Sequence, residues 1–213
     1  VRATNLLIDE AFRNYHAVNI IGLSGPFKNG STMQREAGLY DVLKKSPNVS
    51  LKQLVNIPKM SRDEAKKRFF GLMNRYKDTN VVWSSNYQIH NGAFDAAKEM
   101  GLKAGEELLF GVLDFDDHIL EGISSGEIVC ASGGHYSEGA WAIVLLYDYL
   151  NGKDFVAEAV NYTSPMAVIT RSNVDVFRQN FLIKNLTQES INFIDFSAYS
   201  KVKNSASISP NFK

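Results

Sequence analysis

The feature that most constrains the fold is the alternation of short apolar runs with segments whose apolar residues repeat at helical spacing. Val18–Leu23 is an almost unbroken apolar run, which is typical of a strand buried on both faces. A helical pattern follows it at Thr32–Lys44. Strands that alternate with helices in this way form βαβ units. The sequence therefore predicts an α/β fold, an open parallel sheet with helices on both faces.

The same alternation continues along most of the chain. It predicts further strands at 49–57, 80–84, 108–113, 128–132 and 155–160, and helices at 1–15, 61–76, 89–100, 116–125 and 137–150. Ser61 and Glu64 form a capping box, and Gly101 suits a left-handed helix end. After about Thr170 the pattern fades, and we expect the Ser- and Asn-rich tail 201–213 to be irregular.

Charge and cysteine content narrow the class of partner. Lys plus Arg and Asp plus Glu each total 23, so a general attraction to nucleic acid is not expected. No apolar stretch reaches the roughly 18 residues of a membrane span, so we expect no direct membrane insertion. Cys130 is the single cysteine, which excludes an internal disulfide, and its apolar neighbours predict a buried structural thiol.

Polar and aromatic side chains follow four of the predicted strands. In open α/β sheets, ligands bind beyond the carboxyl ends of the strands. The candidate ligand-binding residues at these positions are Phe27, Arg35, Asn86, Tyr87, Asp114 and His135. An arginine, a carboxylate and an amide can together donate to and accept from sugar hydroxyl groups. We therefore expect a sugar-like ligand, with an aromatic ring over its apolar face.

Each candidate also has a purely structural interpretation. Asn86 and Asp114 are residue types that favour helix N-caps. Arg35 could lie on the outer surface of its helix, and Phe27 and Tyr87 could pack instead of stacking on a ligand. His135 could be an ordinary loop residue. The argument for a site rests on the shared placement of these residues after strands.

An enzymatic alternative is metal-assisted hydrolysis by Asp114 with the carboxylates and imidazole that follow it, Asp116, Asp117 and His118. Asp116 and Asp117 also open a predicted helix, where the helix dipole favours acidic residues. The sequence lacks Gly-x-Ser-x-Gly, the P-loop pattern and Gly-x-Gly-x-x-Gly. We therefore expect no enzymatic activity, no cofactor and no metal.

Four segments resemble the type I periplasmic binding proteins of the ribose-binding, sugar-transport class. Val18–Leu39 resembles the second-lobe strand, binding loop and helix of that family, with its Arg-x-x-Gly pattern at Arg35 and Gly38. Three other segments resemble elements of the same family. Residues 81–97 resemble its strand–Asn–helix element, and Gly111–Asp114 resembles its Gly-Phe-Asp element. Residues 126–139 resemble its crossover toward the first lobe.

The resemblance implies a two-lobed protein that clamps its ligand in the cleft by hinge closure. Residues 1–135 would form the second, ligand-binding lobe, 136–165 the returning helix and strand of the first lobe, and 166–213 a C-terminal extension. The first lobe would then be largely missing from this chain, and the chain alone is expected to bind weakly.

The resemblance also implies site residues and partners. Arg35, Asn86 and Asp114 match ligand contacts of the family, and Tyr87 stands where the family usually has Asp. Either His135 or Gly134 stands where the family often has Gln. The implied function is to hold a sugar in the periplasm for the permease of an ABC transporter. Two alternatives are a periplasmic sensor that docks on a membrane kinase, and the effector domain of a LacI-like regulator.

Overall fold

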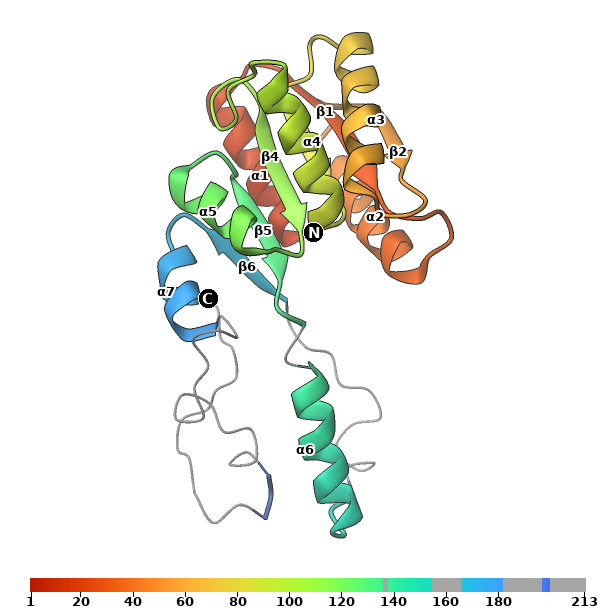
Figure 1. Cartoon of the computed structure of the whole chain (residues 1–213), viewed down its shortest axis with the longest axis vertical. Coiled ribbons are helices and arrows are strands. Elements are labelled where there is room, and N and C mark those ends of the chain that lie inside the picture. Colours follow the sequence, from red (N-terminus) through yellow and green to blue (C-terminus); the bar gives the residue numbers. More distant parts are fainter. Residues whose placement is uncertain (136–137, 155–165, 182–196, 200–213) are drawn as a thin grey trace. The chain divides into compact units, whose positions relative to one another are not determined.

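The computed structural model describes residues 1–135, 138–154, 166–181 and 197–199 (Figure 1). The chain divides into two compact units. The first unit comprises Val1–Gly133 and Val168–Asp175, and the second comprises Gly134–Ala167 and Val176–Lys213. The candidate residues that precede Gly134 therefore belong to the first unit, and His135 belongs to the second.

A six-stranded sheet forms the centre of the first unit, in the order β2-β1-β3-β4-β5-β6. The strands are β1 (Val18–Ser24), β2 (Val49–Asn56), β3 (Val81–Ser84), β4 (Leu109–Leu113), β5 (Cys130–Gly133) and β6 (Ala167–Thr170). Strands β1 to β5 pair in parallel along the sheet. The prediction of an open, mostly parallel α/β sheet is thus confirmed, and the carboxyl ends of these strands share one edge.

Helices cover both faces of this sheet (Figure 1). Those of the first unit are α1 (Arg2–Asn14), α2 (Gly30–Leu43), α3 (Arg62–Arg75), α4 (Tyr87–Glu99) and α5 (Asp117–Ser125). Helices α1 and α2 contribute to one core cluster on the sheet. On the other face α3 packs on α4, and the Phe94 ring of α4 lies 5.5 Å from the His118 ring of α5. The sheet is therefore buried on both sides, as the continuous apolar strands predict.

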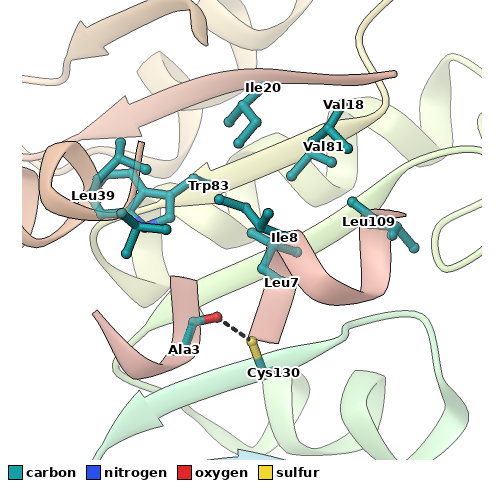
Figure 2. Packing of buried hydrophobic residues seen from close by; sticks show 12 residues of the cluster. Ala3, Leu7, Ile8, Val18, Ile20, Leu39, Val81, Trp83, Leu109 and Cys130 are labelled. Carbon is teal, nitrogen blue, oxygen red and sulfur yellow. Dashed lines mark hydrogen bonds between the residues drawn. The ribbon is translucent and has the colours of Figure 1, made fainter. Parts of the chain in front are cut away.

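The apolar core explains why α1 belongs to this unit. Leu7 and Ile8 of α1 pack against Trp83 of β3 and Leu109 of β4 (Figure 2). The next residue along β4, Phe110, faces the opposite layer, where its ring lies 5.3 Å from Phe94. Alternate residues of one strand therefore fill two different cores.

Side-chain caps begin the helices that follow strands. The side chains of Asn29, Ser61, Asn86 and Asp116 accept hydrogen bonds from backbone N–H groups of α2, α3, α4 and α5. The predicted cap at Ser61 is confirmed by its bond from the Glu64 N–H. At the other helix ends, the predicted left-handed conformation of Gly101 is confirmed by its φ of 72°, and Gly126 has a left-handed φ of 90° as well.

Two elements, both after residue 160, lie where no strand or helix was predicted from the sequence. Strand β6 lies next to β5 in the sheet, and helix α7 (Val174–Phe181) follows it. Sequence reasoning missed β6, Ala167–Thr170, although Met166–Ile169 is a short apolar run of the kind that marks β3 and β5. The strand predicted at 155–160 and the tail 201–213 lie outside the described residues.

The second unit contains α6 (Glu138–Leu150). Asp148 of this helix is buried and accepts hydrogen bonds from the Ser197 hydroxyl and from the Ala198 N–H at 2.8 Å. The Tyr199 hydroxyl donates to the Asn151 carbonyl at 2.7 Å. These bonds join the end of α6 to residues 197–199. Among all helices of the described ranges, none has the length and apolar character needed to cross a membrane.

Candidate functional site

An ion pair between Arg35 and Asp114 is the centre of the candidate site. Arg35 lies in α2 and Asp114 directly follows β4, yet Arg35 Nη1 lies 2.8 Å from Asp114 Oδ2. Both side chains are mostly buried, with 17% of each exposed. A pair shielded in this way is stronger than one in open solvent, because water screens it less. The prediction that these two residues come together is borne out by this geometry.

Backbone geometry orients both partners of the pair. Arg35 Nη1 also donates to the Ser85 carbonyl at 2.6 Å, at the carboxyl end of β3. Asp114 has a left-handed φ of 65°, which Asp tolerates better than most residues. Its N–H donates to the Ser132 carbonyl at 2.7 Å, which ties the turn to β5. The guanidinium and the carboxylate are therefore held at the edge where ligands bind in α/β sheets.

Asn86 stands next to Ser85 on the same edge. Its Oδ1 accepts a hydrogen bond from the Gln88 N–H at 2.8 Å, so the capping interpretation of Asn86 is confirmed. Its Nδ2 group makes no hydrogen bond within the described part of the chain, and neither do Arg35 Nε and Nη2. One edge of the sheet therefore offers amide and guanidinium donors beside the Asp114 carboxylate.

The capping interpretation of Asp114 is wrong, because Asp116 is the N-cap of α5. Asp116 Oδ1 accepts from the Ile119 N–H at 2.9 Å, and Asp116 Oδ2 accepts from Asn91 Nδ2 at 2.7 Å. The two residues between Asp114 and the first turn of α5 leave the Asp114 carboxylate turned toward Arg35. The interpretation of Arg35 as an outer-surface residue is also wrong, because its side chain is mostly buried and pairs with Asp114.

The aromatic candidates differ in their surroundings. Phe27 is 74% exposed in the β1–α2 loop, so it does not pack in the core. The Lys28 ammonium lies 5.9 Å from the centre of its ring. Tyr87 is the first residue of α4 and is half-buried. Contact of either ring with a ligand stays a prediction.

His135 is exposed and belongs to the second unit. Its role in binding therefore stays a prediction, as does the assignment of 1–135, 136–165 and 166–213 to lobes and an extension.

The carboxylates of the metal-hydrolase alternative have other partners. Asp116 is engaged by Asn91 and by the helix it caps, while Asp117 lies in the first turn of α5. Groups of three or more metal-ligating side chains do not occur among residues 1–135, 138–154, 166–181 and 197–199. Asp116 and Asp117 thus serve the start of α5.

Sequence reasoning missed two polar residues at this edge, Glu36 and Asn56. Asn56 Nδ2 donates to Glu36 Oε1 at 2.8 Å and to the Gly25 carbonyl at 3.0 Å. Asn56 escaped the search for residues after strands because the predicted strand ran one residue further, to Ile57. The polar character of Asn56, two residues before Pro58, was the available signal.

Buried groups beneath the edge have little capacity for acid–base chemistry. Cys130 is fully buried, and this burial raises the pKa of its thiol to about 12. Its Sγ donates to the Ala3 carbonyl at 3.2 Å, which confirms the prediction of a structural thiol. The hydroxyls of Ser24 and Ser84 are buried too, without a hydrogen-bond partner among the described residues.

Comparison with known proteins gives consistent matches. The family described as "Periplasmic binding protein domain" matches residues 4–154. The galactofuranose-binding protein of Escherichia coli (strain K12) is 27% identical over 111 residues, which are 51% of this chain and 35% of that protein. A periplasmic sugar-binding protein from Pseudomonas fluorescens has a TM-score of 0.76 at 27% identity, covering 92% of this chain and 61% of that one.

A third match shows the fold alone. The periplasmic binding protein component of the arabinose ABC transporter from Shewanella sp. ANA-3 has a TM-score of 0.71 at 21% identity, covering 88% of this chain and 60% of that one. The chain thus spans about a third of the curated relative and about three fifths of the solved structures. The matched region includes Arg35, Asn86 and Asp114. The sheet topology, the polar edge and these matches agree that the chain belongs to the periplasmic binding protein family.

Proposed function

We propose that this chain carries the sugar-binding lobe of a solute-binding protein, which holds a neutral sugar at the edge formed by Arg35, Asn86 and Asp114. The proposal depends chiefly on one observation, the shielded Arg35–Asp114 pair at the carboxyl edge of the sheet. The names of the relatives support it, since they describe proteins that bind galactofuranose, arabinose and other sugars.

The chemistry of the edge suits hydroxyl groups. Nε and Nη2 of Arg35 and Nδ2 of Asn86 supply donors, and the Asp114 carboxylate supplies acceptor oxygens. Because the pair is neutral as a whole, a neutral ligand leaves its charge balance unchanged, whereas an anionic ligand would compete with Asp114 for Arg35. A sugar hydroxyl can both donate and accept, so it can bridge the two partners.

We propose that the protein passes its sugar to the permease of an ABC transporter and acts in the periplasm. The arabinose-transporter component among the structural relatives supports this partner. The relatives are named as binding proteins, so we propose binding without chemical transformation of the sugar.

The test is a thermal-shift screen of the full-length protein against pentoses, hexoses, polyols, sugar acids and amino acids, followed by calorimetry. A ligand that binds only the folded state raises the melting temperature. We expect a neutral pentose or hexose to do so. Arg35→Lys and Asp114→Asn should then weaken its affinity by about 10- to 100-fold, because lysine lacks the planar fork of donors of arginine and Asp114→Asn leaves the Arg35 guanidinium without its counter-charge.

Arg13→Lys is the matched control. Arg13 also forms an ion pair, with Glu10 at 2.8 Å, but it lies near the end of α1 and is 75% exposed. We expect its affinity for sugar to equal that of the wild type. The proposal fails if amino acids or sugar acids alone stabilise the protein, or if Arg35→Lys and Asp114→Asn both bind as the wild type does.

A further inference from the structure

Hydrogen bonds link the carboxyl ends of neighbouring strands one after another. Asn56 at the end of β2 donates to the Gly25 carbonyl, which follows β1, at 3.0 Å. The Gly25 N–H donates in turn to Ser85 Oγ, which follows β3, at 2.9 Å. The backbone of Gly25 is therefore held on both sides, at its carbonyl by Asn56 and at its N–H by Ser85.

The same series continues from Ser85 to the ion pair. The Ser85 carbonyl accepts from Arg35, Arg35 pairs with Asp114, and the Asp114 N–H donates to Ser132 at the end of β5. We call the bonded series from Asn56 to Ser132 the strand-end network. It spans five adjacent strands of the sheet, and Asn56 is its terminal member on the β2 side.

We propose that Asn56 is a positioning residue for the sugar-binding arginine, acting through Gly25 and Ser85 on one side and through Glu36 on the other. This inference rests on the proposed function of the edge and identifies a determinant of its affinity. Asn56 does not need to touch the ligand, because it acts by limiting the positions available to Arg35.

The amide of Asn56 has a single favourable orientation. Its Nδ2 group faces two acceptors, the Gly25 carbonyl and Glu36 Oε1. The opposite orientation would place Oδ1 against both acceptors, so it is disfavoured. Both N–H groups of the Asn56 side-chain amide therefore donate hydrogen bonds at this edge.

Glu36 connects Asn56 to the binding arginine by a second route. It is the residue after Arg35 in α2, so the bond from Asn56 at 2.8 Å holds the same turn of the helix. Arg35 is thus held at its backbone through Glu36 and at its guanidinium through Ser85.

Packing around Gly25 leaves its peptide little freedom. A Cβ added there would lie 2.6 Å from Thr32 Oγ1 and 3.2 Å from the Met60 methyl. Thr32 belongs to α2 and Met60 to the β2–α3 connection, so the Gly25 backbone lies between these two segments. We therefore expect that, when the Asn56 hydrogen bonds are lost, the shift of Gly25 also moves Ser85 and does not stay within the β1–α2 loop.

The first test removes the two donors. In the full-length protein, Asn56→Ala should weaken sugar affinity by about tenfold, since two hydrogen bonds that order the site are lost. Asn80→Ala is the matched control. Asn80 also joins neighbouring strands, accepting from the Asn19 N–H at 2.9 Å and donating to the Ala17 carbonyl at 2.7 Å, but at the amino ends of the strands. Asn80→Ala should lower stability and leave sugar affinity unchanged.

The second test gives a readout that a general loss of stability would not change. Asn56→Asp places a carboxylate against Glu36, and two carboxylates that share one hydrogen-bonding position favour holding a proton between them. Sugar affinity of Asn56→Asp should therefore rise as pH falls from about 8 to about 5, beyond any change in the wild type or in Asn56→Ala. Adding Glu36→Gln supplies a donor amide and restores a hydrogen bond between positions 56 and 36, so the double variant should lose this pH dependence.

Hydrogen exchange of the Gly25 N–H, followed by NMR, tests positioning without any ligand. Faster exchange in Asn56→Ala than in Asn80→Ala is expected, because the Gly25 backbone loses the hydrogen bond that restrains its carbonyl side. If the wild type binds no sugar but this difference is seen, the positioning role stands and the proposed function fails. If Asn56→Ala binds sugar as the wild type does, or exchange at Gly25 is unchanged, the positioning role is overturned.

Discussion

His90 of α4 is a fully buried imidazole in aromatic surroundings. Its ring stacks on Phe94 at 5.6 Å and meets the edge of Phe110 at 5.5 Å. Neither ring nitrogen has a hydrogen-bond partner within the described ranges. This burial lowers the pKa of His90 from 6.5 to about 3, His118 adds to the lowering, and Asp95 opposes it. The folded protein therefore requires His90 to remain neutral.

The neutral His90 predicts a loss of stability in mild acid. Above the unfolded pKa of 6.5 the ring is neutral in both states, and its contribution is fully present. Between pH 6.5 and about pH 3, His90 binds a proton in the unfolded chain but stays neutral in the folded protein. The free energy of unfolding should fall by about 2 kcal/mol at pH 5 from this residue alone. Urea denaturation at about pH 8 and about pH 5 measures it.

His90→Phe keeps a ring but removes the titrating group. The decrease in its free energy of unfolding from about pH 8 to about pH 5 should therefore be about 2 kcal/mol smaller than that of the wild type. The exposed His16 provides the control, and His16→Phe should retain the wild-type pH dependence. An equal pH dependence in His90→Phe and the wild type would contradict this account of the buried ring.

At the scale of elements, α3 and α4 approach each other closely because of Gly92. A Cβ added at Gly92 would lie 2.1 Å from the Arg62 carbonyl oxygen and 2.9 Å from the Ala65 Cβ. Arg62 also pairs with Asp95 through two hydrogen bonds, of 2.7 and 2.9 Å, which raise the pKa of its guanidinium. The close packing of α3 on α4 therefore requires a residue without a side chain at position 92.

Two glycine substitutions separate this packing from helix propensity. Gly92→Ala should destabilise the protein by about 1–3 kcal/mol, because backbone atoms of α3 must move. Gly71 lies inside α3 with nothing within 4 Å of an added Cβ, so Gly71→Ala should stabilise by about 0.5–1 kcal/mol. Thermal and urea unfolding of the two variants should give shifts of opposite sign. Equal stabilisation by both would show that α3 and α4 can separate freely.

At the scale of the whole molecule, the first unit is built from two stretches of chain that are distant in sequence. Residues Val168–Asp175 add β6 to the sheet of Val1–Gly133. Ile169 and Val174 of this second stretch are each 1% exposed. The sheet is therefore complete only after the chain has passed through the second unit and returned.

A shortened chain tests this dependence. A chain ending at Gly133 should be less stable than one that also carries β6, by roughly 1.5–3 kcal/mol for each large apolar side chain that it no longer buries. A Cβ added at Gly134 would lie 3.6 Å from the Ala167 Cβ, so a short glycine–serine linker can join 1–134 to 167–181. Urea denaturation should show that this joined chain is the more stable of the two. Equal stability would mean that β6 is dispensable to the unit.

The alternation of apolar runs and helical segments determined the class of sheet, the strands β1 to β5 and most helix ends. These depend on local periodicity and on caps such as Ser61, which are written within a few neighbouring residues. The rule that ligands bind after parallel strands also selected Arg35, in the helix that follows β1, and Asp114, directly after β4, because the carboxyl ends of parallel strands share one edge.

Only the tertiary structure decided how those residues are used. It assigned the cap of α5 to Asp116, freed Asp114 to pair with Arg35, and brought Asn56 and Glu36 together from separate elements. It also showed that Ala167–Thr170, which the sequence left unassigned, lies beside β5 as β6. The physical reason is that hydrogen bonds between distant segments depend on the register and packing of the assembled sheet, which local sequence does not encode.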